Sequence, residues 1–248
     1  MSVSKNQIKL VKSLDSKKNR RKEGLFVAEG PKVVGDLLRA GFTSHFIFAT
    51  ESYLKDFRNA LAVTDEELRK LSFLQHPQGV LGVFQIPAPL TPQTSSISPH
   101  SSALALALDG VQDPGNMGTI IRIADWFGID TIYCSPDTAD AYNPKVVQAT
   151  MGSIAHVHLI YCDLVELLSH ADCPVYGTLL DGQDIYRQEL SSEGIIVMGN
   201  EGNGISEAVR PLITHRLLIP NFNPHAATAE SLNVAIATAI TCSEFRRR

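Results

Sequence analysis

A series of short, almost continuously apolar runs constrains the fold more than any other feature of this sequence. The runs lie at residues 104–108, 131–134, 157–160, 175–179, 195–198 and 217–219. Most of them are separated by stretches that are compatible with a helix. A strand that is apolar on both faces must be covered on both faces, so the pattern predicts a mostly parallel sheet between two layers of helices, an α/β fold.

A segment rich in proline and serine divides the chain. Residues 86–102 (IPAPLTPQTSSISPHSS) contain four prolines and no Asp, Glu, Lys or Arg. Such a composition is typical of an extended linker that cannot bury a core. We therefore expect a small domain over residues 1–87, a linker over 88–102 and a larger α/β domain over 103–248.

The small domain also shows alternating helix and strand patterns. Residues 25–28 and 45–49 are predicted strands, and residues 31–39 a helix with Pro31 at its first position. Thr64 and Glu67 have the spacing of a capping box. The first domain is therefore expected to be a small α/β domain, whereas residues 231–245 predict a buried last helix in the second.

Charge is unevenly distributed along the chain. The formal net charge of −4 argues against a nonspecific polyanion binder, yet the first thirty residues hold eight Lys or Arg against three Asp or Glu. This basic segment is compatible with phosphate contacts and equally with a solvated helix face. No apolar run follows it as in a secretory signal, and no run is long enough to span a bilayer, so a cytoplasmic protein is expected.

The cysteines do not form a metal-binding pattern. Cys134, Cys162, Cys173 and Cys242 show neither a C-x-x-C motif nor His/Cys ligand spacing. Three of them lie in apolar runs, where a free cysteine behaves as a small hydrophobic residue. We expect structural cysteines and no metal site.

Three polar loops follow predicted strands, at residues 109–118, 199–204 and 220–231. In an open α/β sheet, ligands bind beyond the carboxyl ends of the strands. Asn116 lies near a predicted helix start, and Arg122 follows within that helix. Each loop alone is more often an ordinary turn or helix cap. Residues 199–204 read G-x-x-G-x-G, which is not a dinucleotide fingerprint, and no P-loop motif is present; this argues against a nucleotide-cofactor oxidoreductase.

Taken together, these stretches resemble the SpoU/TrmH family of RNA ribose 2′-O-methyltransferases, part of the SPOUT superfamily. The similar motifs are LDGVQDPGNMGTIIRIADWFGI (108–129), IIVMGNEGNGIS (195–206), and LIP (218–220) with SLNVAIA (231–237). The segment YNPKVVQATMGS (142–153) is also similar to the family. The segment KNRRKEGLFVAEG (18–30) resembles the small substrate-binding domain of many members, so the resemblance covers nearly the whole chain.

The resemblance implies a C-terminal domain with a deep trefoil knot, a homodimer through that domain, and S-adenosylmethionine as cofactor. The implied cofactor-binding residues are Gly199, Ile219, Leu232, Thr178, Leu179 and Gly202. The implied catalytic residues are Arg122, Asn116, Glu201, Ser231 and Asn233. The expected RNA-binding residues of the basic segment are Lys18, Arg20, Arg21 and Lys22.

The implied substrate is RNA. Ribosomal RNA is favoured over transfer RNA, because the appended small domain is typical of members that act on the large ribosomal subunit. A noncatalytic RNA-binding protein with the same fold is the alternative from another class. The presence of all five implied catalytic residues argues against that alternative.

The chemistry of methyl transfer leaves one role open. The 2′-oxygen must lie about 3 Å from the methyl carbon and lose its proton. Arg122 is the base that the resemblance implies, but a guanidinium with a pKa above about 12 is a poor proton acceptor. The alternative role of Arg122 is a bidentate grip on an RNA phosphate. Glu201 is expected to orient Arg122 or Asn116, and Ser231 and Asn233 to cap the last helix while facing the site.

The chain departs from the family at two places. The loop at 221–230 (NFNPHAATAE) is longer than usual and lacks the Met and Gly that normally follow the proline. Gln148 stands where relatives often have Arg, so one RNA contact is missing. His225 in the long loop is a candidate base, although a lone loop histidine is more often solvated.

Overall fold

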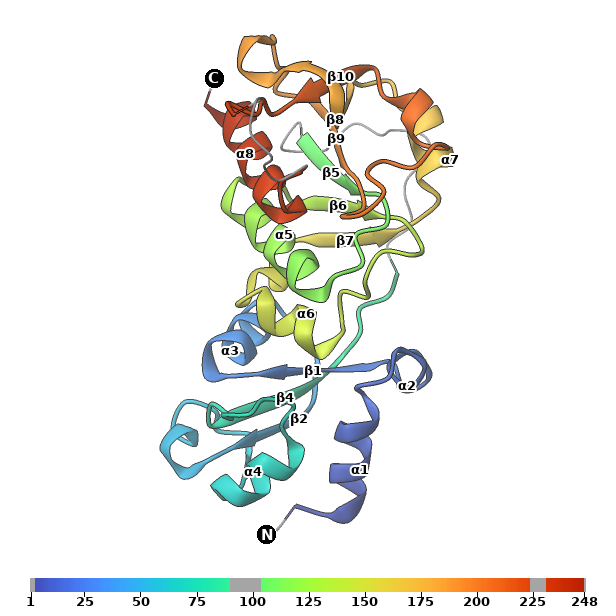
Figure 1. Ribbon diagram of the computed structural model, residues 1–248. Coiled ribbons are helices and arrows are strands. Elements are labelled where there is room, and N and C mark those ends of the chain that lie inside the picture. Colours follow the sequence, from blue (N-terminus) through green and yellow to red (C-terminus); the bar gives the residue numbers. More distant parts are fainter. Residues whose placement is uncertain (1–2, 90–103, 224–230, 248) are drawn as a thin grey trace. The chain divides into compact units, whose positions relative to one another are not determined.

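The computed structural model of the chain describes residues 3–89, 104–223 and 231–247 (Figure 1). The chain forms two compact units. The first unit comprises Met1–Ala88 together with Asp140–His156, and the second comprises Pro89–Ala139 together with Val157–Arg248. The segment Asp140–His156 thus packs into the first unit, although it lies between strands of the second. From residue 90 on, the expected linker lies outside the described residues, so the division of the chain at 88–102 stays a prediction.

The first unit contains a four-stranded sheet in the order β1-β4-β2-β3. Its strands are β1 (Leu25–Glu29), β2 (Ser44–Ala49), β3 (Leu61–Ala62) and β4 (Val80–Gln85). β4 pairs antiparallel with both β1 and β2, and β3 pairs parallel with β2. The expected strands at 25–28 and 45–49 are confirmed, whereas β4 was not predicted.

Helices surround this sheet: α1 (Lys5–Ser13), α2 (Lys17–Glu23), α3 (Pro31–Arg39), α4 (Asp65–Leu71) and α6 (Pro144–Ala149), with 3₁₀ turns at Glu51–Tyr53 and Ser153–Ala155. The predicted helix at 31–39 and the Thr64/Glu67 capping box are both confirmed. A second capping box, made by Ser4 and Gln7, starts α1. Gly24, at φ 64°, ends α2 in the left-handed conformation that favours glycine.

The second unit contains a six-stranded parallel sheet in the order β10-β8-β9-β5-β6-β7. Its strands are β5 (Leu104–Leu108), β6 (Thr131–Cys134), β7 (His158–Tyr161), β8 (Val175–Asp184), β9 (Gly194–Met198) and β10 (His215–Leu218). Every residue of β5 and β9 is buried. The predicted parallel α/β sheet is therefore confirmed, and burial on both faces explains the continuous apolar runs.

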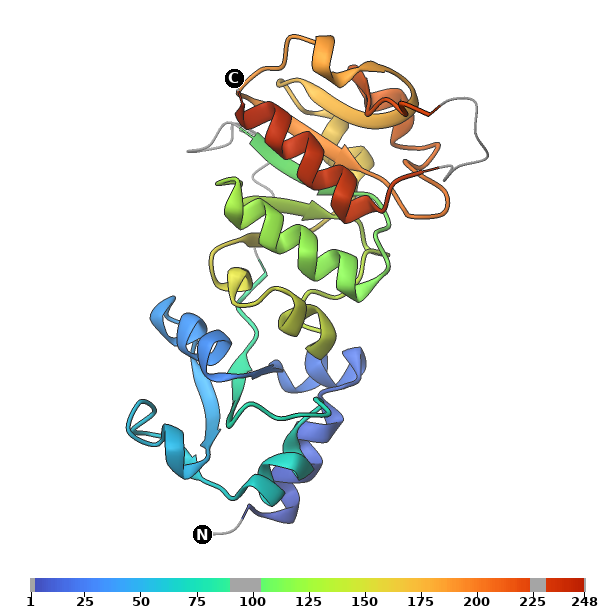
Figure 2. The ribbon, with the colours of Figure 1, turned by 60° about the vertical axis from the view of Figure 1, so that its left-hand side comes forward.

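Helices cover both faces of this sheet. α5 (Pro114–Trp126) and α8 (Val234–Arg246) lie side by side on one face, and α7 (Leu164–Ser169) covers the other together with the 3₁₀ turn Arg210–Leu212 (Figure 1, Figure 2). A further 3₁₀ turn, Ile185–Arg187, follows β8. α8 begins three residues later than the expected helix at 231–245. Seven of its thirteen residues are buried, so the expected burial of this helix is confirmed only in part. Two of the buried polar side chains, Thr238 and Thr241, donate to the carbonyls of Val234 and Ala237, so their hydroxyls are paired inside the protein.

The described residues contain neither a membrane-spanning helix nor a cluster of metal ligands. No helix in residues 3–89, 104–223 or 231–247 combines the length and the hydropathy that a membrane span requires. Within the same ranges, no three His, Cys, Asp or Glu side chains gather into a group that could hold a metal ion.

Candidate functional site

The first two polar loops leave the sheet next to each other. β5 and β9 are parallel neighbours whose last residues, Leu108 and Met198, are register partners. The loops that begin at Asp109 and Gly199 therefore start from one edge of the sheet. The backbone N–H of Asp109 continues the ladder by donating to the carbonyl of Met198 at 2.9 Å. This is the edge where α/β sheets bind ligands.

Two polar residues tie these loops together, and neither was predicted as a site residue. Asp109 is buried, and its carboxylate accepts the backbone N–H of Ser206 at 2.7 Å. Asn200 donates to the carbonyl of Gly110 at 2.7 Å and accepts the N–H of Gly202 at 2.8 Å. Asp109 is the first polar residue after its strand, and Asn200 is the first after β9 and Gly199. That position was the signal that could have identified them.

Gly199 is required by a close approach of the backbone. A Cβ at this position would lie 2.2 Å from the carbonyl carbon of Gly204 and 2.3 Å from the nitrogen of Ile205. The loop closes there through two hydrogen bonds of 2.9 Å between the backbones of Asn200 and Gly204. Any side chain at residue 199 would push this closure apart.

A chain of side-chain hydrogen bonds joins all three motifs. Asn233 donates through Nδ2 to Oδ1 of Asn116 at 2.9 Å. Asn116 in turn donates through Nδ2 to the Glu201 carboxylate at 2.9 Å. We call these three residues the Asn116 relay. Of the two partners expected for Glu201, the structure therefore brings Asn116 into contact with it.

The Asn116 relay lies where two helices begin. Asp113 caps α5 by accepting the N–H of Asn116, and Asn233 caps α8 by accepting the N–H groups of Ala235 and Ile236 at 3.0 and 3.3 Å. At the other end, Arg246 of α8 donates to the carbonyls that follow α5, at Phe127 and Gly128. The two helices are therefore parallel, and both N-termini meet at the relay. Their partial positive charges favour an anionic group there.

Arg122 and Ser231 stand outside this network. Arg122 is exposed on α5, and no hydrogen bond or ion pair joins it to another described residue. Ser231 is also exposed, and the expectation that it caps the last helix is wrong, because Asn233 provides that cap. Asn233 combines the two roles expected of it, since it caps α8 with its oxygen and contacts Asn116 with its nitrogen.

The residues expected to hold a cofactor lie within β8, in the loops after β9 and β10, and before α8. The ladder between β8 and β9 ends at Gly177, and β10 pairs with Gly177 and next with Gln183, so residues 178–182 stand outside both ladders. Thr178 and Leu179 belong to this unpaired part of β8. The hydroxyl of Thr178 contacts the sulfur of Met198 at 3.7 Å, and Leu179 is buried.

The other expected cofactor residues come from the neighbouring loops. Ile219 follows β10 and is half-buried. Gly202 is exposed in the loop after β9. Leu232 directly precedes the α8 cap and is 51% exposed. The middle of β8, the loops after β9 and β10 and the residue before the α8 cap thus supply these positions.

Two arginines bind the unpaired part of β8 at residues 178–182 through Asp181. Asp181 accepts from Arg210 at 2.7 Å and from Arg216 at 3.0 Å through the same carboxylate oxygen. Desolvation acts to raise the pKa of Asp181, but the hydrogen bonds and the charges of the two arginines hold it below its ordinary value. Asp181 therefore stays ionised and fixes the loop that carries Thr178 and Leu179.

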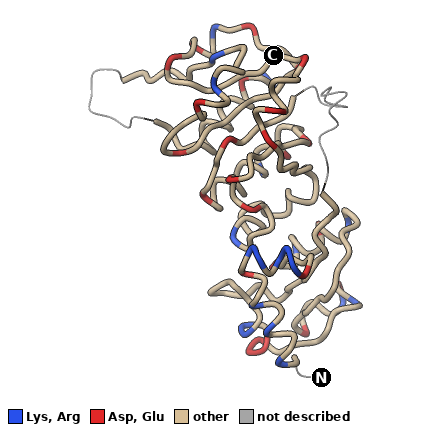
Figure 3. The backbone as a smooth tube through the Cα atoms, turned by 90° about the vertical axis from the view of Figure 1, so that its right-hand side faces the viewer, with Lys and Arg blue, Asp and Glu red and all other residues tan. Residues whose placement is uncertain are grey.

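The expected RNA-binding residues lie on α2 in the first unit, and one expectation among them is wrong. Lys18, Arg21 and Lys22 are exposed (basic residues are blue in Figure 3). Arg20 is only 1% exposed, and its guanidinium donates to the Asp140 carboxylate at 2.6 and 3.1 Å and to two backbone carbonyls. Because its donors face protein acceptors, Arg20 stabilises the fold and is not available to phosphate.

Of the positions where the sequence departs from the family, the structure describes Gln148 but not His225. Gln148 lies on α6 in the first unit and is half-buried. His225 and residues 224–230 of the long loop lie outside the described residues. The structure therefore gives no position for the candidate base.

Known proteins match nearly the whole chain. Residues 103–243 match the SpoU rRNA Methylase family, and residues 5–82 match the MRM3-like substrate binding domain. The 23S rRNA (guanosine(2553)-2′-O)-methyltransferase RlmP of Bacillus subtilis is 30% identical over 99% of this chain and 98% of its own length.

Solved structures agree with these matches. A putative TrmH-family RNA methyltransferase from Porphyromonas gingivalis is 41% identical, with a TM-score of 0.88 over 100% of this chain and 99% of its own. An AdoMet-bound rRNA methyltransferase from Sinorhizobium meliloti is 30% identical, with a TM-score of 0.85 over 100% and 96% of the two chains. The expected resemblance is confirmed, and the chain belongs to the SpoU rRNA methylase family.

Proposed function

We propose that this protein transfers a methyl group from S-adenosylmethionine to a ribose 2′-hydroxyl of ribosomal RNA. The observation that carries the proposal is the Asn116 relay, which joins three loops far apart in the sequence at the carboxyl edge of a parallel sheet. The named activity of the Bacillus subtilis relative and the AdoMet bound to the Sinorhizobium meliloti neighbour support it.

The residues around the strand ends suit this cofactor. Thr178, Leu179, Gly199, Gly202, Ile219 and Leu232 would hold it. Main-chain groups of residues 178–182, which stand outside the sheet ladders, can bond the polar edge of an adenine, and apolar side chains such as Leu179 and Ile219 can cover its faces. When bound, the cofactor supplies an electrophilic methyl group on a sulfonium.

The Asn116 relay determines which donor is offered to the substrate. The oxygen of Asn116 accepts from Asn233, and one of its two N–H groups donates to Glu201. One N–H remains for the ribose oxygen or an adjoining RNA phosphate. The N-termini of α5 and α8 lower the energy of negative charge at the same place, either on that phosphate or on the developing alkoxide.

The role proposed for Arg122 is a grip on an RNA phosphate that positions the ribose. The side chain is exposed and engages no described residue, so it can reach a phosphate. A guanidinium is an always-charged, bidentate phosphate ligand. Proton transfer to phosphate or water, or to Arg122 itself as the alternative, completes the reaction. Ser231, exposed beside the start of α8, is proposed to add a polar contact to the substrate.

The proposal includes a homodimer, a trefoil knot and a cytoplasmic location. Trp126 at the end of α5 is 84% exposed and Ile236 near the start of α8 is 53% exposed, and exposed apolar side chains on neighbouring helices suit contact with a second copy of the chain. The knot is proposed because the resemblance to the SpoU family implies it, and the chain belongs to that family. Residues 1–87 are proposed as the RNA substrate-binding domain and residues 103–248 as the methyltransferase domain, joined by the linker at 88–102, in keeping with the two family matches.

Calorimetry with S-adenosylmethionine and transfer of a labelled methyl group to ribosomal RNA test the function. We expect the wild-type protein to bind the cofactor, and Arg122→Ala to bind it nearly as well while losing turnover. Substantial transfer by Arg122→Ala would refute the role of Arg122. A protein that binds RNA but no S-adenosylmethionine would instead be the noncatalytic alternative. Mapping ribose methylation in total RNA with and without the gene distinguishes ribosomal from transfer RNA.

A further inference from the structure

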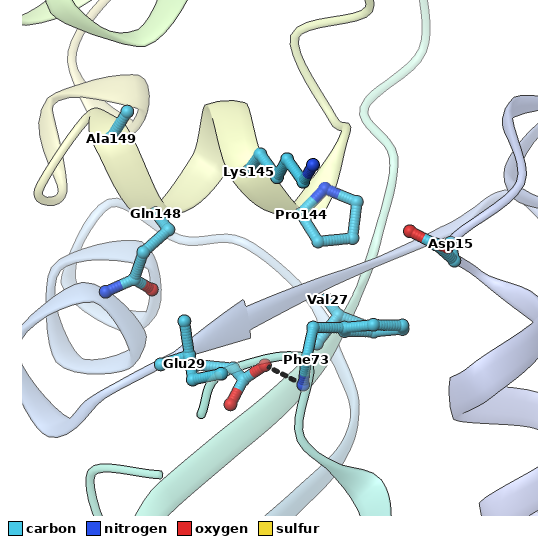
Figure 4. A pocket seen from close by; sticks show the side chains of 9 residues that line it. Asp15, Val27, Glu29, Phe73, Pro144, Lys145, Gln148 and Ala149 are labelled. Carbon is cyan, nitrogen blue, oxygen red and sulfur yellow. Dashed lines mark hydrogen bonds between the residues drawn. The ribbon is translucent and has the colours of Figure 1, made fainter. Parts of the chain in front are cut away.

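A cavity of about 450 Å³ lies within the first unit, where β1, the residues that follow α4, and helix α6 come together (Figure 4). Buried Val27 and Pro144 form part of its apolar surface, and the partly exposed Phe73 and Leu74 form another part. The volume falls within the range of about 300–1,000 Å³ that holds small organic groups. None of the residues assigned to methyl transfer lines this cavity.

The cavity contains a buried carboxylate whose acceptor capacity is only half used. Glu29 is 5% exposed, and its two oxygens accept from the backbone N–H of Phe73 at 2.7 Å and from the hydroxyl of Ser72. A carboxylate offers about four lone-pair positions, so about one remains on each oxygen. Among the described residues no cation lies within ion-pair distance of Glu29; Lys12, which donates to the carbonyl of Ser72, acts on it only through its charge. Desolvation by burial raises the pKa of Glu29 and outweighs the hydrogen bonds from Ser72 and Phe73 and the charge of Lys12, which lower it.

The cavity also offers an aromatic ring and an amide. The ring of Phe73 is half-buried, and the ammonium of Lys12 lies 4.8 Å from its centroid. Aromatic rings of this kind stack with unpaired bases in RNA-binding proteins. Gln148 reaches from α6 toward the side of the cavity that Glu29 occupies (Figure 4). Its amide both donates and accepts hydrogen bonds.

Basic residues adjoin the cavity along the chain. Asp15 lines the cavity, and two residues later α2 begins with the exposed Lys17 and Lys18, followed by the exposed Arg21. Lys145, which is exposed, itself lines the cavity, and together these cations complement a phosphate backbone. This complementarity favours a nucleic acid over a peptide or an uncharged metabolite as the occupant.

We propose that this cavity binds an unpaired guanine base of the RNA substrate, with the Glu29 carboxylate accepting its N1–H and N2–H groups. This proposal rests on the RNA-directed function proposed above. Guanine presents two adjacent donors that match two adjacent acceptors. Adenine and cytosine would each bring a ring nitrogen with a lone pair against one carboxylate oxygen, and uracil has a single donor between two carbonyls. The amide of Gln148 can donate to the guanine O6, which adjoins N1.

Binding of short labelled oligonucleotides to the full chain tests the proposal. The probes are uridine heptamers with one central guanosine, adenosine or inosine, and the assay is fluorescence anisotropy. Inosine keeps N1–H and O6 but lacks the N2 amine. We expect the guanosine probe to bind about tenfold more tightly than the adenosine probe, the discrimination typical of one bidentate contact, with inosine in between. Equal affinity for guanosine and adenosine, or no binding of either probe, overturns the proposal.

Two variants assign the preference to the cavity. Glu29→Gln should reduce guanosine binding to the level of adenosine, and Gln148→Ala should weaken guanosine binding about threefold without changing adenosine binding. The matched control is Glu66→Gln, on the exposed face of α4, which should keep the full preference. If Glu29→Gln does not fold, Gln148→Ala decides the outcome alone. A guanosine preference that survives in the cavity variants contradicts the proposal.

Methyl transfer to ribosomal RNA, measured on the same wild-type preparation, separates the two proposals. Transfer without a guanosine preference removes only the base-binding site. Failure both to bind S-adenosylmethionine and to transfer the methyl group removes the proposed function itself.

Discussion

Asn233 makes two kinds of hydrogen bond, and substitutions at this residue can measure the contribution of each. Its oxygen accepts the N–H groups of Ala235 and Ile236 and so caps α8, whereas its nitrogen donates to Asn116. Asn233→Ala removes both kinds of hydrogen bond. Asn233→Asp keeps the cap, because Asp caps helices as well as Asn does, but it cannot donate to the oxygen of Asn116.

The structure gives the size of each effect. Loss of the cap costs about 1 kcal/mol, and loss of the exposed hydrogen bond to Asn116 adds about 0.5 kcal/mol. We expect Asn233→Ala to lower the Tm of the second unit by roughly 3–6 °C, since 1 kcal/mol shifts Tm by about 2–4 °C in a chain of this size. Asn233→Asp should leave Tm within about 2 °C of the wild type, because a carboxylate also suits a helix N-terminus.

Asn233→Asp should keep the stability of the protein but lose much of its activity. The new carboxylate of Asn233→Asp faces the oxygen of Asn116, so the Asn116 amide must turn and lose its donation to Glu201. We expect methyl transfer to fall at least about tenfold, which corresponds to about 1.4 kcal/mol of transition-state stabilisation. Thermal unfolding and transfer from labelled S-adenosylmethionine to ribosomal RNA measure the two effects. Wild-type turnover in Asn233→Asp would refute the relay, and a loss of Tm equal to that of Asn233→Ala would refute the cap.

Substitutions at Gly199 and Arg20 and alkylation of Cys162 test other parts of the structure. Gly199→Ala places a methyl group 2.2 Å from the backbone of Gly204, so we expect at least about tenfold weaker binding of S-adenosylmethionine by calorimetry; unchanged affinity would contradict the close approach. Arg20→Ala leaves Asp140 without its guanidinium and should cost about 3–5 kcal/mol of unfolding free energy by denaturant titration, whereas Arg21→Ala on the same helix should cost almost nothing; equal effects would show that Arg20 is not structural. Burial, with a smaller effect of the neighbouring acidic side chains, raises the pKa of Cys162 to about 11, so the reactive thiolate is rare at neutral pH. Alkylation of Cys162 in the folded protein, followed by mass spectrometry, should be slow at pH 7 and accelerate about tenfold per pH unit toward pH 11, and a rate that levels off near pH 8 would exclude this shift.

The parallel sheet could be predicted because its physical cause is local in the sequence. A strand that lies in the middle of such a sheet, as β5 does, needs apolar residues at every position, and five consecutive apolar residues are easily recognised. β4 was not predicted, although it is an interior strand of the first sheet and pairs with both β1 and β2. Its Gly82 interrupts the apolar run, and a Cβ there would lie 2.4 Å from the ring of Phe84. A glycine that lowers strand propensity was therefore retained for packing that the sequence does not reveal.

Charge alone could not predict which residues of the basic segment are buried and which are exposed. Arg20 and Arg21 are neighbours in a run of cations, yet one is buried and the other exposed. The difference depends on Asp140, which lies 120 positions further along the chain and belongs to a segment that packs into the first unit. Sequence spacing on α2 gives the angle between the two side chains, but only the tertiary partner decides which of them faces the interior.

One part of the site could be predicted from the sequence, whereas the other part depends on the three-dimensional structure. The loops after β5 and β9 had to be neighbours once their strands were parallel neighbours, and the polar residues at their starts could be expected to converge. The start of α8 reaches the same point for a different reason, because α8 runs parallel to α5 and is fixed at its far end by Arg246. An antiparallel α8 would have placed Asn233 at the opposite end of α5, away from Asn116. The direction of the last helix therefore decides whether the third motif can contribute to the site, and the bond from Asn233 to Asn116 follows from that direction.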